Sequence, residues 1–156
     1  MLSNTKRQIL ATYSIPDFSE VYLENFAITY ISLSPLEKKN YFGNKTNGKF
    51  VENLEGKIVK KAWLEIPNLF PICKMGLFGI KENEFAGIIT IVNDISREVS
   101  RKLVPVIIST FKSRSTKLLN QFHGTHGRVF WENTYRELRL ESLDELNNVL
   151  QSIKTI

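Results

Sequence analysis

The sequence predicts a single α+β domain over residues 1–156, and three observations point to this fold class. A chain of 156 residues is long enough to bury a core of its own. Its 42% hydrophobic and 11% aromatic residues are typical of a globular protein. Apolar segments rich in β-branched and aromatic residues alternate with segments whose apolar residues recur at helical spacing. No repeat, low-complexity tract or linker-like change of composition divides the chain, so we expect one unit.

Four segments are predicted to form strands. The first is rich in β-branched and aromatic residues, and a polar loop around Gly43 and Gly48 follows it. The second and third are joined as a hairpin near residues 81–83. Gly124 and Gly127 interrupt the chain before the fourth, which is short. In chain order, the predicted strands are residues 26–33, 72–80, 85–92 and 129–131.

Two helices are predicted from apolar residues at helical spacing. The first ends before Pro67, because a residue that precedes proline is disfavoured in a helix. Its apolar residues are Ile58, Val59, Ala62, Trp63 and Ile66. The second spans residues 103–120 and has Pro105 in its first turn, where proline is tolerated. Its apolar stripe consists of Leu103, Val106, Ile107, Phe111 and Leu118.

A last helix is predicted to begin at Ser142, with Glu145 three residues later completing a capping box. Its apolar face consists of Leu146, Val149, Leu150 and Ile153. The elements therefore follow the order β-α-β-β-α-β and end in a helix. That order predicts a ferredoxin-like fold, in which an antiparallel sheet has helices on one face, plus the C-terminal helix.

The charge of the chain is distributed unevenly. The net charge is +5, and nine Lys or Arg residues lie between Arg97 and Arg139 against three acids. A one-sided basic surface suits the phosphate backbone of a nucleic acid. A solvated helix face on a mildly basic protein is the alternative interpretation.

The chain has one cysteine and two histidines, so it offers few candidate ligands for a metal and no pair of cysteines for a disulfide bond. Cys73 is the single cysteine, which excludes a disulfide framework and favours a reducing, cytoplasmic location. No apolar run approaches the ~20 residues of a membrane span, so we expect no membrane partner. His123 and His126 are weak candidates for holding a transition metal. No third ligand is suggested near them, and solvent-exposed histidines are the simpler interpretation.

The third predicted strand carries the most informative pattern. Side chains alternate along a strand, so positions 84 and 86 point to one face while Phe85 points to the other. Two ligands at such positions would form a preorganised half of a metal site. The sequence Asn83-Glu84-Phe85-Ala86-Gly87-Ile88-Ile89 resembles the active-site strand of the REP-associated tyrosine transposases, relatives of the single-tyrosine insertion-sequence transposases. In that family two histidines hold a divalent cation, and Glu84 and Ala86 occupy their positions here.

The resemblance extends over most of residues 15–153. It implies the ferredoxin-like fold, an origin in a mobile element, DNA transposition as the ancestral activity, and a homodimer. The matching segments, in chain order, are Ile15-Pro16, Phe26–Thr29, Tyr41–Gly43, Gly56–Val59, Trp63–Pro67, Phe70-Pro71, Phe111–Ser113, Thr116-Lys117, Asn120, Trp131, Tyr135 and Glu137.

The resemblance also implies that catalysis is lost. Ser152 stands where the family has its nucleophilic tyrosine, and a serine is shorter and has a far higher pKa than a phenol. Glu84 offers one oxygen ligand to Mg or Mn, while Ala86 offers none. We therefore expect an inactive homologue without a cofactor. Mg or Mn would be needed only if activity is retained.

The leading hypothesis is a transposase-like protein that binds single-stranded or hairpin DNA. Cations would contact phosphates, and Trp131 would stack on a base. One alternative is an active metal-dependent nuclease or transposase that uses Glu84. Another is a protein-interaction or regulatory module on the same scaffold. The candidate DNA-binding residues are Arg101, Lys102, Lys112, Arg114, Lys117, Arg128, Trp131 and Arg136.

Overall fold

The computed structural model describes residues 26–92 and 97–154, so the predicted match at Ile15-Pro16 lies outside the described residues. Within these ranges, one sheet has four strands in the order β4-β5-β1-β6, and every neighbouring pair is antiparallel. The predicted ferredoxin-like fold is confirmed. The strands are β1 (Phe26–Leu33), β4 (Cys73–Lys81), β5 (Glu84–Val92) and β6 (Arg136–Leu140).

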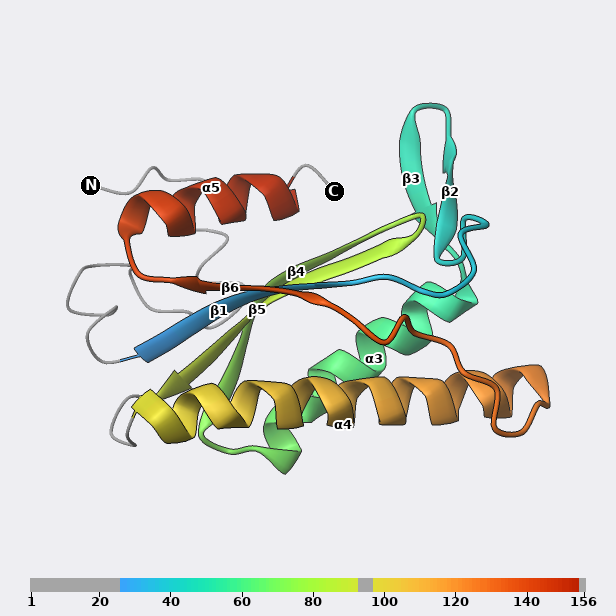
Figure 1. Ribbon diagram of the computed structural model, residues 1–156. Helices are drawn as coiled ribbons and strands as arrows, with labels where there is room; N and C mark the ends of the chain where they lie inside the picture. Colours follow the sequence, from blue (N-terminus) through green and yellow to red (C-terminus); the bar gives the residue numbers. More distant parts are fainter. Residues whose placement is uncertain (1–25, 93–96, 155–156) are drawn as a thin grey trace.

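Among the described residues, three helices cover the two faces of this sheet (Figure 1). Helices α3 and α4 pack on one face, and α5 lies on the other. A small separate hairpin projects from the loop between β1 and α3 (Figure 1). The bounds are α3 (Leu54–Leu69), α4 (Arg97–His123), α5 (Leu143–Lys154), β2 (Gly43–Thr46) and β3 (Lys49–Glu52).

Alternate side chains of the central strands supply two separate cores, as expected from the pleat of a sheet. On β1, Ile31 points to α3 and α4, while Ile28 points to α5. On β5, Phe85 and Ile88 divide in the same way. A Cβ added at Gly87 would lie 2.8 Å from Trp63, so this glycine lets the indole of α3 pack directly onto β5. Ala86 therefore belongs to the α5 layer, whereas Phe85 and Trp63 belong to the α3–α4 layer.

The predicted first helix has the wrong C-terminal end. Helix α3 continues through Pro67 to Leu69, and the N–H of Phe70 closes it on the carbonyl of Ile66 at 3.0 Å. Proline removes one N–H from the helix. Because Pro67 lies in the final turn, that loss affects only the carbonyl of Trp63 four residues earlier, and the helix tolerates it.

The predicted second helix is too short, and its stripe is displaced. Helix α4 starts at Arg97, so Pro105 lies in its interior rather than in its first turn. Val106, assigned to the stripe, is 50% exposed. The sequence has apolar residues on both sides of the true stripe, which obscures its phase. The buried residues of α4 from position 104 onward are Val104, Ile107, Ile108, Phe111, Ser115 and Leu119.

The fourth predicted strand is wrong in position. Trp131 makes only an isolated bridge with Pro35, and the strand that joins the sheet is β6, five residues later. Strand β6 lies at the edge of the sheet, and Arg136, Glu137 and Leu138 are exposed. A charged edge strand lacks the apolar run by which the buried strands were recognised.

The remaining predictions are confirmed with small differences. Strands β4 and β5 form the expected hairpin. The hydroxyl oxygen of Ser142 accepts a hydrogen bond from the N–H of Glu145 at 3.1 Å, as in a helix cap, and the apolar face of α5 is buried. The polar loop around Gly43 and Gly48 is itself a hairpin. Among the described residues, no helix combines the length and apolar character that crossing a membrane requires.

Candidate nucleic-acid interface

Glu84 and Ala86 lie on the α5 face of the sheet, as the strand period predicted. The hydroxyl of Ser32 on β1 donates a hydrogen bond to the Glu84 carboxylate at 2.9 Å. Ala86 is fully buried in the core that also contains Leu150 and Ile153 of α5. The side chain at position 86 therefore contributes packing and has no donor atom for a metal.

Tyr30 and Arg136 are further polar residues close to Glu84. Burial raises the pKa of Tyr30, and the negative charge of Glu84 raises it further, while Arg136 and a hydrogen bond with Ser32 lower it. Glu84 is thus part of a polar cluster of β1, β5 and β6. Among the described residues, no group of three or more His, Cys, Asp or Glu side chains is placed to hold a metal ion.

Ser152 is exposed on α5, next to Ile153, which packs on the same core as Ala86. The structure therefore places Glu84 and Ala86 on the face of the sheet that α5 covers, while Ser152 lies on the exposed side of α5. Glu84 is engaged by Ser32, Ala86 is buried, and Ser152 has neither the reach nor the acidity of a phenol. These residues do not fit a divalent cation site.

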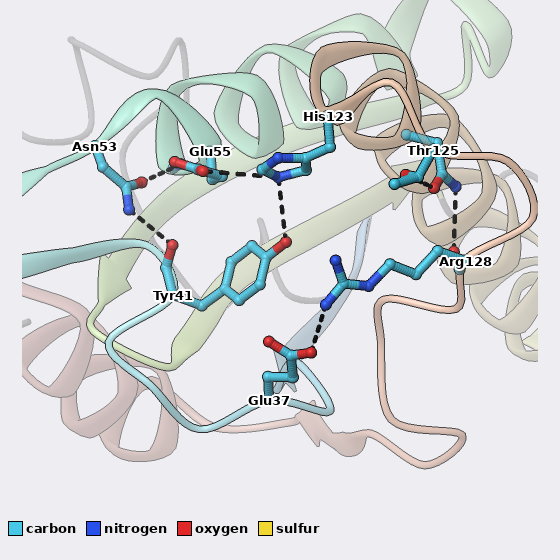
Figure 2. Close-up of polar contacts among 9 residues, drawn as sticks. Glu37, Tyr41, Asn53, Glu55, His123, Thr125 and Arg128 are labelled. Atoms are coloured by element: carbon cyan, nitrogen blue, oxygen red, sulfur yellow. Dashed lines mark hydrogen bonds and ion pairs between the residues drawn. The ribbon is translucent and has the colours of Figure 1, made fainter.

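The two histidines contact different surroundings. The Nε2 atom of His123 lies 3.4 Å from the hydroxyl oxygen of Tyr41 and 3.6 Å from a carboxylate oxygen of Glu55 (Figure 2). His126 is exposed and lines a depression beside Lys117. His123 thus connects the end of α4 with the start of α3 and the loop that precedes β2.

A groove of about 530 Å³ runs between α4 and the segment of residues 127–135. Its helix wall carries hydroxyl, amide and ammonium groups, and its other wall includes a guanidinium and a phenol. A second depression continues it past Lys117 at the C-terminal end of α4. A third lies between Arg101 of α4 and Arg139 of β6. The polar residues of the main groove that matter here are Lys112, Ser113, Thr116, Asn120, Arg128 and Tyr135.

Lys112 holds the two walls of this groove together. Its ammonium donates hydrogen bonds to the carbonyl oxygen of Glu132 at 2.7 Å and to that of Asn133 at 3.4 Å. It also lies 5.4 Å from the ring centroid of Tyr135. Burial lowers the pKa of Lys112, and the charge of Glu132 opposes that shift. Lys112 therefore shapes the groove as well as charging it.

The other predicted cations are divided between the groove and other surfaces. Arg128 lines the groove and pairs with Glu37 of the loop that precedes β2 (Figure 2). Arg114 pairs with Glu65 of α3 at 3.1 Å, away from the groove wall. Arg136 of β6 lies near Tyr30 of β1. Arg101, Lys102 and Lys117 are exposed on α4.

The predicted role of Trp131 in base stacking does not agree with its position. The side chain is 3% exposed, and its Nε1 donates a hydrogen bond to the hydroxyl of Ser115 at 2.9 Å. The rings of Phe42, Phe111 and Phe130 surround the indole. Both faces of Trp131 are therefore occupied by the core, and the residue supports the groove from beneath.

The sequence prediction missed the uncharged polar groups of the groove. Asn120 donates to the carbonyl oxygen of Arg128 at 3.1 Å and accepts from Thr125, so it fixes the loop that leads into the second wall. One signal was present in the sequence. Polar residues 109, 113, 116 and 120 recur at helical spacing opposite the buried stripe and therefore form one face of α4.

No family model matches the chain, and no curated protein matches it. Among solved structures, the chain is similar to a REP-associated tyrosine transposase bound to a REP hairpin, with a TM-score of 0.52 and 9% sequence identity. The match covers 81% of this chain and 64% of that chain, so this chain spans less than two thirds of the neighbour's length. At this identity the likeness concerns the fold alone. The chain therefore has a transposase-like, ferredoxin-like fold.

Proposed function

We propose that this protein binds single-stranded or hairpin DNA in the groove between α4 and residues 127–135, and that it does not cleave the DNA. The observation that carries the proposal is the groove itself, whose walls present cations, hydroxyls and an amide together. Side chains of these types make most contacts to phosphate and sugar. The solved structure with a similar fold contains a bound DNA hairpin, which supports the same class of ligand.

The charges extend the groove into a track along α4. Arg101 and Arg139 lie at one end, Lys112 and Arg128 in the middle, and Lys117 at the other end. A DNA backbone that follows this track meets cations at both ends and in the middle, although Glu132, Glu137 and Glu141 also line it. Tyr135, half-buried in the wall, takes the aromatic role first assigned to Trp131.

The residues at the positions that the resemblance assigns to catalysis support the proposal that the protein does not cleave DNA. A transposase of the resembling family needs two metal ligands and a tyrosine there. This chain offers Glu84, which Ser32 engages, a buried alanine and a serine. A homodimer and a cytoplasmic location are proposed from the resemblance and from the lone cysteine, respectively.

The test is a fluorescence-anisotropy titration of labelled single-stranded and hairpin DNA at a series of salt concentrations. If about four phosphates are neutralised, the logarithm of the binding constant falls with the logarithm of salt with a slope of about −3. Lys117→Ala should reduce that slope by about 1. Lys61→Ala removes an exposed lysine of α3 outside the groove and should leave the slope unchanged. A wild-type protein that binds neither DNA at low salt would contradict the proposal.

A further inference from the structure

The hairpin of β2 and β3 presents a face whose chemistry the groove on α4 does not account for. Strand pairing places Thr46 opposite Lys49 and Asn44 opposite Val51, so these four residues share one face of the ribbon. All four are exposed, and Val51 is 55% exposed. This face, hereafter the ribbon face, carries an amide, a hydroxyl, an ammonium and a small apolar group.

The opposite face of the ribbon is used for attachment. Phe50 packs against the core that α3 and α4 cover. A Cβ at Gly43 would lie 2.2 Å from the carbonyl oxygen of Val51, and φ of Gly43 is +151°, so only glycine fits there. Glu52, the one acid within residues 43–52, is paired with Lys60 at 2.9 Å. The ribbon face itself therefore carries no negative charge.

The hairpin has a defined shape at both ends. Asn47 and Gly48 have φ of 52° and 76°, as a tight turn that matches the twist of two strands requires. At the base, the side-chain amide of Asn53 donates a hydrogen bond to the carbonyl oxygen of Tyr41 at 2.8 Å. The backbone N–H of Tyr41 donates a hydrogen bond to the side-chain oxygen of Asn83 at 3.0 Å. A ribbon fixed in this way loses little freedom on binding a ligand.

The base of the hairpin also adjoins the groove. Tyr41 contacts His123 at the end of α4, and Glu37, in the loop before the hairpin, pairs with Arg128 of the groove wall (Figure 2). A DNA that leaves the groove at the C-terminal end of α4 thus arrives beside the hairpin. The contacts in Figure 2 connect the base of the hairpin with the end of α4 and the loop that follows it.

We propose that the ribbon face enters the major groove of duplex DNA, such as the stem of a DNA hairpin held on α4. The major groove admits a two-stranded ribbon. In the major groove, base edges accept hydrogen bonds from amide and ammonium groups, and they can donate hydrogen bonds to a hydroxyl or accept them from it. The methyl group of thymine contacts small apolar groups. The ribbon face offers each of these partners. This inference rests on the proposed DNA binding and adds the duplex as the form of DNA that the protein distinguishes.

The experiment compares single-stranded DNA with a hairpin that contains a duplex stem of about one helical turn. We expect the double variant Thr46→Ala, Lys49→Ala to bind the hairpin about tenfold or more weakly, because it loses two groove contacts. Its affinity for single-stranded DNA should stay within twofold. Lys57→Ala, an exposed lysine on α3, is the matched control, and unchanged melting temperatures show that all variants are folded.

The outcomes separate the two proposals. If the double variant binds both DNAs as the wild type does, the ribbon inference is overturned while DNA binding on α4 stands. Equal weakening for both DNAs also overturns it, because the hairpin would then contact phosphates without regard to the duplex. A wild-type protein that binds single-stranded DNA but no hairpin overturns it as well. If the wild type binds neither DNA, both proposals fall.

Discussion

The two faces of the sheet have different relationships to the resembling transposases. On the α3–α4 side, an aromatic core supports a polar, cationic groove. On the α5 side, an aliphatic core fills the position where the family has a metal ligand. One face therefore presents a groove with cations, while on the other face a packed alanine stands at a position to which the resemblance assigns a metal ligand. A ferredoxin-like sheet permits this division because alternate residues of β1 and β5 serve separate layers.

Removal of the indole beneath the groove should have the largest effect. Trp131→Ala is expected to lower the free energy of unfolding by about 3–5 kcal/mol, because a buried aromatic is lost and a cavity remains. The hydroxyl oxygen of Ser115 also loses the hydrogen bond that Trp131 donates to it. Urea denaturation measures the change, and Trp131→Phe, which keeps most of the volume, is the control. A loss below about 1 kcal/mol would show that the groove does not depend on this core.

Restoration of a family ligand should be costly on the other face. Ala86→His is expected to lower the free energy of unfolding by about 2 kcal/mol, because position 86 is fully buried and overpacking is unfavourable. Addition of Mn²⁺ should not recover that loss, since Glu84 is bonded to Ser32. Thermal melts with and without Mn²⁺ provide the measurement, and Ala86→Ser is the smaller control. Metal-dependent stabilisation of Ala86→His would mean that the α5 layer still contains a usable site.

The thiol of Cys73 reports on how dry the α3–α4 side is. Burial raises its pKa from 9.0 to about 12. Below pH 9 the thiol is protonated in both states. Above pH 9 the unfolded chain loses this proton while the folded protein keeps it, so stability falls as the pH rises. At pH 10 the thiol alone should cost about 1.4 kcal/mol.

Urea denaturation at pH 8 and pH 10 measures this loss in the wild type and in Cys73→Ala. The variant should lack the contribution of the thiol, so its free energy of unfolding should change less between the two pH values. Equal changes in both proteins would show that water reaches this side of the sheet.

The sequence predicted the strands that lie inside the sheet better than the parts that frame the groove. Residues 26–33 and 85–92 are mostly apolar, because both of their faces are buried. Strand β6 carries Arg136, Glu137 and Arg139 because it is an edge strand, and its pattern resembles a loop. The phase of α4 was misjudged because Val106 is apolar yet exposed.

The local sequence predicted which cations lie on α4, but it did not predict which surface of the protein each of them belongs to. Lys112, Arg114 and Lys117 lie within six residues, yet Lys112 and Arg114 contact different segments. Lys112 bonds to the second wall of the groove, and Arg114 pairs with Glu65 of α3. These partners are distant in sequence, so only the packing of α4 against two other segments assigns each cation to a surface.

The smallest effect is expected at Ser152. If this residue were a nucleophile, Ser152→Ala would abolish cleavage of labelled hairpin DNA in Mn²⁺. We expect no cleavage by the wild type, and stability and DNA affinity of the variant within about 0.5 kcal/mol of it, because an exposed position away from the core contributes little. Gel electrophoresis of the DNA and anisotropy titration provide the two measurements, with Glu84→Ala as the parallel variant. A product that both substitutions remove would restore catalysis to the α5 face, and the two faces of the sheet would then act together as one enzyme.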